Sequence, residues 1–187
     1  MKRYFQIYIK SITVIFCTVM LFSCVNNSEE VSDLLKEQNL PIGKAKKAYH
    51  VYKDSGAITS KLITPLLLDF SNRKKHPYNE FPKGVKIINF TNNQQDSVTI
   101  TGNYALTYSK TEVSEIKGNV VVVNHKDKSR LETSQMFWDQ KTRYFVSEKP
   151  FTLYKENDTI TGVGFECKED LSKHLAKQTT GILETKE

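Results

Sequence analysis

Ile116-Lys-Gly-Asn-Val-Val-Val-Val-Asn124 is the first of five short runs between residues 115 and 165 in which apolar and polar residues alternate. The other four runs are Leu131-Glu-Thr-Ser-Gln-Met-Phe-Trp-Asp139, Tyr144-Phe-Val-Ser147, Pro150-Phe-Thr-Leu-Tyr154 and Ile160-Thr-Gly-Val-Gly-Phe165. A period of two places alternate side chains on the same face of a pleated strand. These runs therefore predict strands that together form one continuous apolar surface.

The same alternation continues on the N-terminal side of these runs. We expect a strand from Ala48, an Asp54-Ser-Gly56 turn and a second strand that ends at Phe70. Pro65 predicts an edge strand or a bulge, because proline cannot donate a hydrogen bond to a neighbouring strand. A proline-bearing connection is expected over residues 72–84. Further strands follow it, including one over residues 98–108, and the absence of a convincing long helix predicts an all-β sandwich, jellyroll or barrel.

The first 23 residues have the pattern of a secretory signal. Basic residues at the start precede an apolar stretch from Ser11 to Phe22, which is short for a membrane span. Cys24 follows Leu-Phe-Ser, as in a bacterial lipobox, so we expect it to be lipidated. The alternative is an uncleaved membrane anchor. Both interpretations tether the chain to a membrane near residue 24.

The rest of the chain is long enough for one domain. Removing 23 of the 187 residues leaves 164 residues, which can bury a real core. Residues 24–46 are predicted to be a polar tether with a helical turn or two, and residues 47–187 the β domain. The leader carries three basic residues and no acidic one, so its removal lowers the net charge from +6 to +3. This weak charge argues against a nucleic-acid-binding protein.

The sequence offers no catalytic or metal-binding motif. It contains no phosphate-binding loop, no His-Glu-x-x-His, no Cys-x-x-Cys and no Gly-x-Ser-x-Gly. The histidines lack a second candidate ligand at metal spacing, so we expect no metal and no cofactor. Cys167 lies in an apolar alternation and is expected to be a buried, unreactive thiol.

Several segments resemble the LptC family, the periplasmic component of the lipopolysaccharide-export (Lpt) machinery. The segments are Val51-Tyr-Lys-Asp-Ser-Gly-Ala-Ile, Tyr78-Asn-Glu-Phe-Pro-Lys-Gly-Val, Gly118-Asn-Val-Val-Val, Leu131-Glu-Thr-Ser-Gln-Met-Phe-Trp-Asp, Pro150-Phe-Thr-Leu and Ile160-Thr-Gly-Val-Gly-Phe. No single segment is specific, and the resemblance depends on their order and spacing from Ala48 to about Leu171.

The resemblance implies a twisted β-jellyroll that is open at its ends and has no enzymatic activity. Such a domain receives lipopolysaccharide from an ABC transporter in the inner membrane and passes it to an LptA-like jellyroll in a periplasmic bridge. The family is anchored by an N-terminal membrane helix that contacts the transporter. The lipobox-like leader departs from that pattern and puts the helix contact in doubt. The expected location is the periplasm of a Gram-negative bacterium, at the inner membrane.

The apolar strand face indicates acyl-chain transport even when the family resemblance is set aside. Each methylene kept out of water is worth about 0.8 kcal/mol, and aliphatic and aromatic walls let a chain slide. The predicted lipid-binding residues are Val120, Val122, Leu131, Met136, Trp138, Phe145, Phe151, Leu153 and Phe165. The opposing interpretation is that these residues fill a closed core.

The outer strands are predicted to bind the partner proteins. Unpaired backbone groups on an edge strand can pair with a strand from another protein. We expect the first strand, around Tyr49 and Tyr52, to meet the transporter. The last strand, which reaches Ile182 and Leu183, is expected to meet the bridge.

Two other functions fit the same composition. An envelope lipoprotein with a closed β-sandwich could bind glycans or serve as a structural subunit, with a sealed core and a flat row of exposed aromatic residues. A hydrolase would need carboxylates that converge in a pocket.

Overall fold

The computed structural model describes residues 31, 33–35, 39–91, 95–156 and 158–179. The chain divides into two units, residues 1–38 and residues 39–187. Residues 31 and 33–35 of the first unit are helical, as the helical spacing in the tether predicts. No helix among the described residues is long and apolar enough to cross a membrane. Cys24 and the leader lie outside the described residues.

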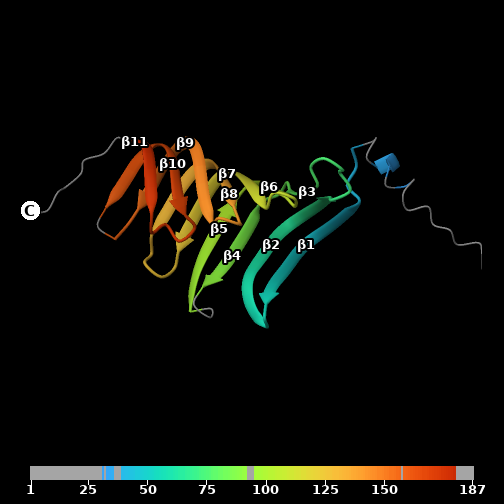
Figure 1. The fold of residues 1–187 in the computed structure, drawn as a ribbon, viewed down its shortest axis with the longest axis horizontal. Coiled ribbons are helices and arrows are strands. Elements are labelled where there is room, and N and C mark those ends of the chain that lie inside the picture. Colours follow the sequence, from blue (N-terminus) through green and yellow to red (C-terminus); the bar gives the residue numbers. More distant parts are fainter. Residues whose placement is uncertain (1–30, 32, 36–38, 92–94, 157, 180–187) are drawn as a thin grey trace, which may run out of the picture. The chain divides into compact units, whose positions relative to one another are not determined.

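The second unit is built from strands (Figure 1). The strands are β1 (Gly43–Asp54), β2 (Ala57–Phe70), β3 (Tyr78–Phe81), β4 (Val85–Thr91), β5 (Asp96–Gly102), β6 (Tyr104–Tyr108), β7 (Val113–Asn124), β8 (Arg130–Asp139), β9 (Tyr144–Tyr154), β10 (Thr159–Lys168) and β11 (His174–Thr179). All of them belong to one antiparallel sheet, which confirms the predicted all-β fold.

The strands follow one another across the sheet almost in chain order. β3 and β4 share one position, and β5 and β6 share the next. β2 pairs with β4 through Ser60–Ile63 and with β3 through Leu68–Phe70. In the same way, β7 pairs with β6 through its first half and with β5 through its second half. The sheet is therefore a meander in which β3 and β4 lie end to end beside β2, and β6 and β5 lie end to end beside β7.

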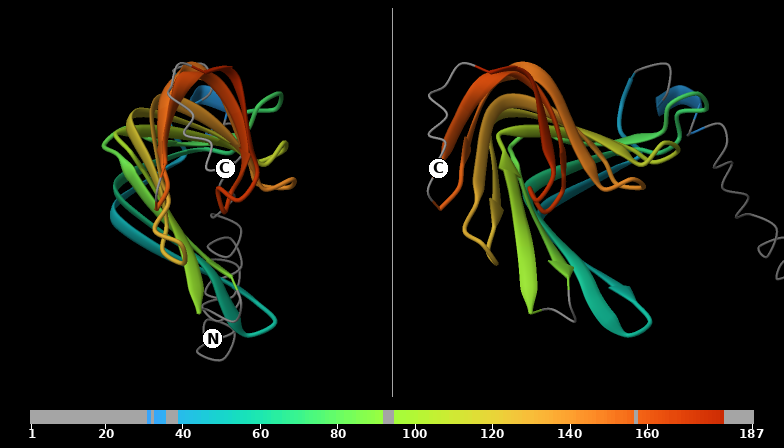
Figure 2. Two further views of the ribbon diagram at one scale, coloured as in Figure 1. Left: turned by 90° about the vertical axis from the view of Figure 1, so that its left-hand side faces the viewer. Right: turned by 60° about the vertical axis from the view of Figure 1, so that its left-hand side comes forward.

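A row of irregular residues crosses the sheet at the level where these strands meet end to end. The pairing register shifts on β7 between Lys117 and Val120, on β8 between Thr133 and Phe137, and on β10 between Val163 and Phe165. Left-handed backbone occurs at the same level on β1, before β4, on β7 and on β10, at Lys47, Gly84, Gly118, Asn119 and Gly164. Bulges bend and twist a strand. Because every bend lies at one level, the sheet curls over on itself (Figure 2).

The row divides the sheet into two halves whose inner faces share one core. Half-sheet A contains β3, β6 and residues 66–70, 113–117, 136–139, 144–147 and 165–168; half-sheet B contains β4, β5 and residues 57–64, 120–124, 130–133, 150–154 and 159–163. Phe151 of half-sheet B meets Phe165 of half-sheet A edge to face, with ring centroids 5.1 Å apart. The buried residues of both halves form a single apolar cluster. This is the jellyroll that the family resemblance implies.

Pro65 lies where the row crosses β2. The pairing with β4 ends at Ile63 and the pairing with β3 begins at Leu68, so the proline faces a gap between the two partners. The Thr64 hydroxyl donates to the Gly84 carbonyl at 2.8 Å across this gap. The prediction of an edge strand is wrong, because β2 pairs with β1 on one side and with β4 and β3 on the other; the proline is accommodated at the interruption between these two partners.

Three predicted boundaries differ from the structure. β1 begins at Gly43 instead of Ala48, because residues 43–46 pair with the C-terminal end of β2. The connection predicted over residues 72–84 contains β3, four residues between Pro77 and Pro82 that pair with both β2 and β6. The single strand expected over residues 98–108 is broken at Asn103, whose N–H donates to the carbonyls of Lys117 and Gly118.

Both ends of the sheet are open within the described residues. β1 pairs with β2 alone and β11 with β10 alone. β11 ends at Thr179 as described, so the predicted edge residues Ile182 and Leu183 lie outside the described part of the chain.

Candidate functional site

A cavity of about 640 Å³ lies between the two half-sheets at the β1 end of the sheet. We call it the β2–β4 cavity. Its apolar wall is formed by Leu62, Leu67, Phe81, Ile87, Phe90 and Trp138. These residues come from β2, β3, β4 and β8, so both half-sheets contribute. The volume falls within the range of ~300–1,000 Å³ that is usual for small-ligand sites.

Strand alternation explains why polar residues accompany this wall. On β2, Ser60 and Leu62 both face the cavity, and on β4, Ile87 and Asn89 do so. Tyr52 of β1 also lines the cavity and is 53% exposed. The cavity therefore has one apolar wall, is otherwise lined by polar and charged side chains and opens to solvent.

Trp138 forms part of the cavity wall and is 6% exposed. Its ring packs against Phe145 with the centroids 6.2 Å apart. The buried indole Nε1 has no hydrogen-bond partner among the described residues. A buried donor left without a partner costs about 1–3 kcal/mol. An acceptor oxygen on a ligand in this cavity could remove that cost.

The nine predicted lipid-binding residues are all buried in the shared core. Trp138 is the member of this set that lines the β2–β4 cavity. Leu131, Phe151, Leu153 and Phe165 surround a space of about 10 Å³ near β11, which is essentially filled. The interior is thus hollow at the β1 end and solid at the β11 end.

Sequence reasoning missed the residues of β2, β3 and β4 that line the cavity. Leu62 and Ile87 stand at alternating positions in apolar strands, the same signal that identified the nine residues. Alternation shows that a residue faces inward. It cannot show whether the facing half-sheet is in contact or several ångströms away.

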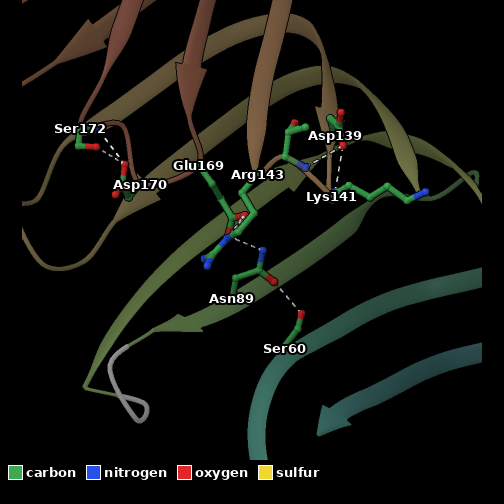
Figure 3. Close-up of polar contacts among 9 residues, drawn as sticks. Ser60, Asn89, Asp139, Lys141, Arg143, Glu169, Asp170 and Ser172 are labelled. Atoms are coloured by element: carbon green, nitrogen blue, oxygen red, sulfur yellow. Dashed lines mark hydrogen bonds and ion pairs between the residues drawn. The ribbon is translucent and has the colours of Figure 1, made fainter. Parts of the chain in front are cut away.

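A chain of polar contacts runs along one side of the cavity (Figure 3). The Ser60 hydroxyl donates to Asn89 Oδ1 at 2.7 Å, and Asn89 Nδ2 donates to Glu169 Oε1 at 2.8 Å. The other carboxylate oxygen, Oε2, accepts from Arg143 Nε at 3.3 Å. Glu169 is only 4% exposed, and these bonds offset the cost of burying its charge.

These contacts join parts of the chain that are far apart in sequence. Ser60 and Asn89 belong to half-sheet B, whereas Glu169 follows β10 and Arg143 lies in the β8–β9 turn. A second contact of this kind is Asn124 Nδ2, which donates to the Asp170 carbonyl at 2.8 Å. The open margins of the two half-sheets are therefore held together by buried or half-buried polar groups.

The remaining titratable groups do not suggest catalysis. Burial raises the pKa of the Cys167 thiol to about 12, so it stays protonated at neutral pH. Cys167 is 3% exposed and packs in the core. Both findings agree with the expected buried, unreactive cysteine.

The two predicted edge residues on β1 face different sides of the sheet. Tyr49 is 58% exposed and lies opposite Ile63 of β2, which is also exposed. Tyr52 lines the β2–β4 cavity. Both belong to an edge strand within the described residues, which is what strand addition by a partner requires.

Comparison with protein families matches the chain to the family described as "Lipopolysaccharide-assembly, LptC-related", over residues 12–184. The chain belongs to the LptC family. LptC proteins are non-enzymatic components of lipopolysaccharide transport, associated with the inner membrane on its periplasmic side. A comparison with curated proteins returned no match.

Proposed function

We propose that this LptC-family protein takes lipopolysaccharide from an inner-membrane ABC transporter and passes it to an LptA-like bridge. In this proposal, acyl chains of the lipid enter the β2–β4 cavity at the β1 end of the jellyroll. The observation that supports the proposal is the cavity itself, which has an apolar wall, is open to solvent and lies next to a free sheet edge.

The energetic reason is the cost of exposing hydrocarbon to water. Each methylene moved from water to an apolar wall contributes about 0.8 kcal/mol, so a chain of a dozen carbons gains on the order of 10 kcal/mol. Leu62, Phe81 and Ile87 supply aliphatic and aromatic side chains, and the charged residues Asp69, Arg143 and Glu169 line other parts of the cavity. Such a wall stabilises an acyl chain without fixing its position along the groove.

The size of the cavity limits what it can hold at once. About 640 Å³ suits one or two acyl chains and is too small for a glycolipid with many chains. The eight other predicted residues form the core behind Trp138, and we propose that they contact lipid when the half-sheets separate. Transfer toward β11 then requires the filled end of the core to open.

The test is photo-crosslinking to lipopolysaccharide in cells. A photoreactive amino acid replaces Trp138 or Phe90 in the cavity wall, or Phe151 in the core, and Phe137 serves as the control. Phe137 neighbours Trp138 on β8 but is 42% exposed on the opposite face. We expect lipid adducts from the inward positions and none from Phe137.

The competing function is a closed β-sandwich that binds glycans or acts as a structural subunit. The filled core near β11 is the observation in its favour. It predicts no lipid adduct from Phe90, Trp138 or Phe151 in a folded protein. That result would overturn the carrier proposal.

A further inference from the structure

We propose that Arg143 binds a phosphate group of the transported glycolipid at the rim of the β2–β4 cavity, and that Glu169 positions it for this contact. This inference rests on the proposed lipid-carrier function and adds a specific polar contact to it. The contact would favour lipids that carry a phosphate close to their acyl chains.

Arg143 stands where two hollows of the domain meet. It lines the β2–β4 cavity and also a second hollow of about 520 Å³, which we call the polar cleft. The polar cleft lies beside the ends of β4, β7 and β10 and includes Lys126, Lys168 and Asp170. A lipid whose acyl chain fills the apolar cavity would thus present its polar part next to Arg143.

Glu169 fixes the guanidinium of Arg143 in two ways. Its carboxylate accepts a hydrogen bond from Arg143 Nε, and its backbone N–H donates to the Arg143 carbonyl at 2.9 Å. The β8–β9 turn is held as well, because Asp139 accepts from the N–H groups of Lys141 and Thr142 (Figure 3). The bond from Thr142 is the main reason that the pKa of Asp139 is lowered. Arg143 is therefore fixed at its backbone and at Nε.

The outer end of the guanidinium is available to a ligand. The Arg143 side chain is 56% exposed, and its terminal Nη1 and Nη2 groups have no partner among the described residues. A guanidinium presents its N–H groups as a planar fork that matches two oxygens of a phosphate. Fixing Nε leaves that fork on the solvent side.

Each acidic group of the polar cleft has a hydrogen-bond or ion-pair partner, although bonds from serine leave the charges of Asp127 and Asp170 in place. Asp96 pairs with Lys126 at 3.1 Å, and Asp127 accepts from the Ser129 N–H and hydroxyl. Burial raises the pKa of Asp170, but the hydrogen bonds that it accepts from the Ser172 N–H and hydroxyl, together with the nearby charges of Lys168 and Arg143, outweigh burial and lower it. Glu169 is occupied by Asn89 and Arg143.

Lys168 forms no salt bridge among the described residues, and the pairing of Arg143 at Nε leaves its fork free, but both cations lie near Asp170, whose pKa their charges help to lower. They are the groups that would attract an anion. Because an apolar cavity adjoins them, the anion that fits best is a phosphate attached to a hydrocarbon chain.

The experiment compares two lipids on the purified full-length protein in detergent. One is lipid A, and the other is lipid A from which the phosphates have been removed enzymatically. The variants are Arg143→Gln, Arg143→Lys and Glu169→Gln. The matched control is Lys126→Gln, a cation of the same cleft that already has a partner.

We expect wild-type protein to prefer phosphorylated lipid A. Arg143→Gln should weaken binding of this lipid by roughly tenfold, the ratio that corresponds to one charge-assisted hydrogen bond, and leave the dephosphorylated lipid unaffected. Arg143→Lys keeps the charge but loses the fork, so its loss should be smaller. Glu169→Gln should also reduce the preference, and Lys126→Gln should leave it unchanged.

Inorganic phosphate distinguishes a lipid phosphate from a free phosphate as the ligand. If millimolar inorganic phosphate displaced bound lipid A as effectively as unlabelled lipid A does, Arg143 would bind a free anion, and the inference would be overturned. Arg143→Gln would also overturn the inference if it weakened the binding of both lipids equally. The same holds if it bound phosphorylated lipid A as tightly as wild type while its circular dichroism showed a folded protein. In those cases lipid crosslinks from Phe90 would still support the carrier function. A wild-type protein that binds neither lipid would contradict both proposals.

Discussion

At the scale of single residues, two variants of Trp138 distinguish the contribution of packing from that of hydrogen bonding. Trp138→Phe removes the unpaired Nε1 donor, which is a gain, and part of the buried ring, which is a loss; because the two oppose each other, the free energy of unfolding should change by less than about 1 kcal/mol. Trp138→Ala removes the ring from the core and should cost about 3–5 kcal/mol. Urea unfolding followed by circular dichroism measures both values.

The same pair of variants also tests the role of the N–H in lipid binding. If a ligand oxygen accepts from Nε1, Trp138→Phe should lower the lipid crosslinking yield from Phe90 while the protein remains as stable as wild type. A stability loss in Trp138→Phe as large as that in Trp138→Ala would show that Nε1 has a partner, and would contradict the argument.

At the scale of the strands, the β10–β11 pair depends on a close approach at Gly162. A Cβ added there would lie 2.3 Å from the Gln178 carbonyl oxygen of β11 and 3.0 Å from the Phe151 ring. Backbone and buried ring cannot both give way, so Gly162→Ala should destabilise the protein by about 1–3 kcal/mol. Amide hydrogen exchange in β11 should become faster.

The control for this prediction is Gly43→Ala on β1, the strand at the other end of the sheet. A Cβ at Gly43 would lie 3.3 Å from the nearest atom, Asp69 Cβ, and its backbone is not left-handed. We expect its effect to be clearly smaller than that of Gly162→Ala. Equal effects, or unchanged exchange in β11, would argue against a close contact at Gly162.

At the scale of the whole molecule, the two free edges should contact different partners. A photoreactive residue at Tyr49 on β1 should give adducts with inner-membrane transporter subunits. The same residue at Leu175 on β11, which is 64% exposed, or at Ile182 and Leu183 beyond it, should give adducts with the bridge protein. Strand addition at each edge would extend the sheet from one jellyroll to the next.

The controls for this experiment are exposed positions away from the edges, such as Phe137 on β8 and Tyr154 on β9. We expect no adduct with either partner from them. A reversed pattern, or adducts with both partners from one edge, would contradict the assignment. If neither edge gave an adduct with a partner protein, strand addition would no longer be part of the proposed function.

The sequence by itself determined the fold class, the inward-facing residues and the unreactive cysteine. Strand alternation is a local property: the period of two in β7 to β10 specifies which side chains share a face without knowledge of any distant residue. That is why all nine predicted residues are buried.

Only the tertiary structure decided where the interior is hollow and how its rim is built. The β2–β4 cavity exists because the half-sheets bend at one row of residues and remain apart at the β1 end, whereas side chains fill the space near β11. The contact between Asn89 and Glu169 joins residues 80 positions apart, and Arg143 and Glu169 are separated by 26. No periodic pattern encodes such contacts, because they depend on the summed bends of every strand between them.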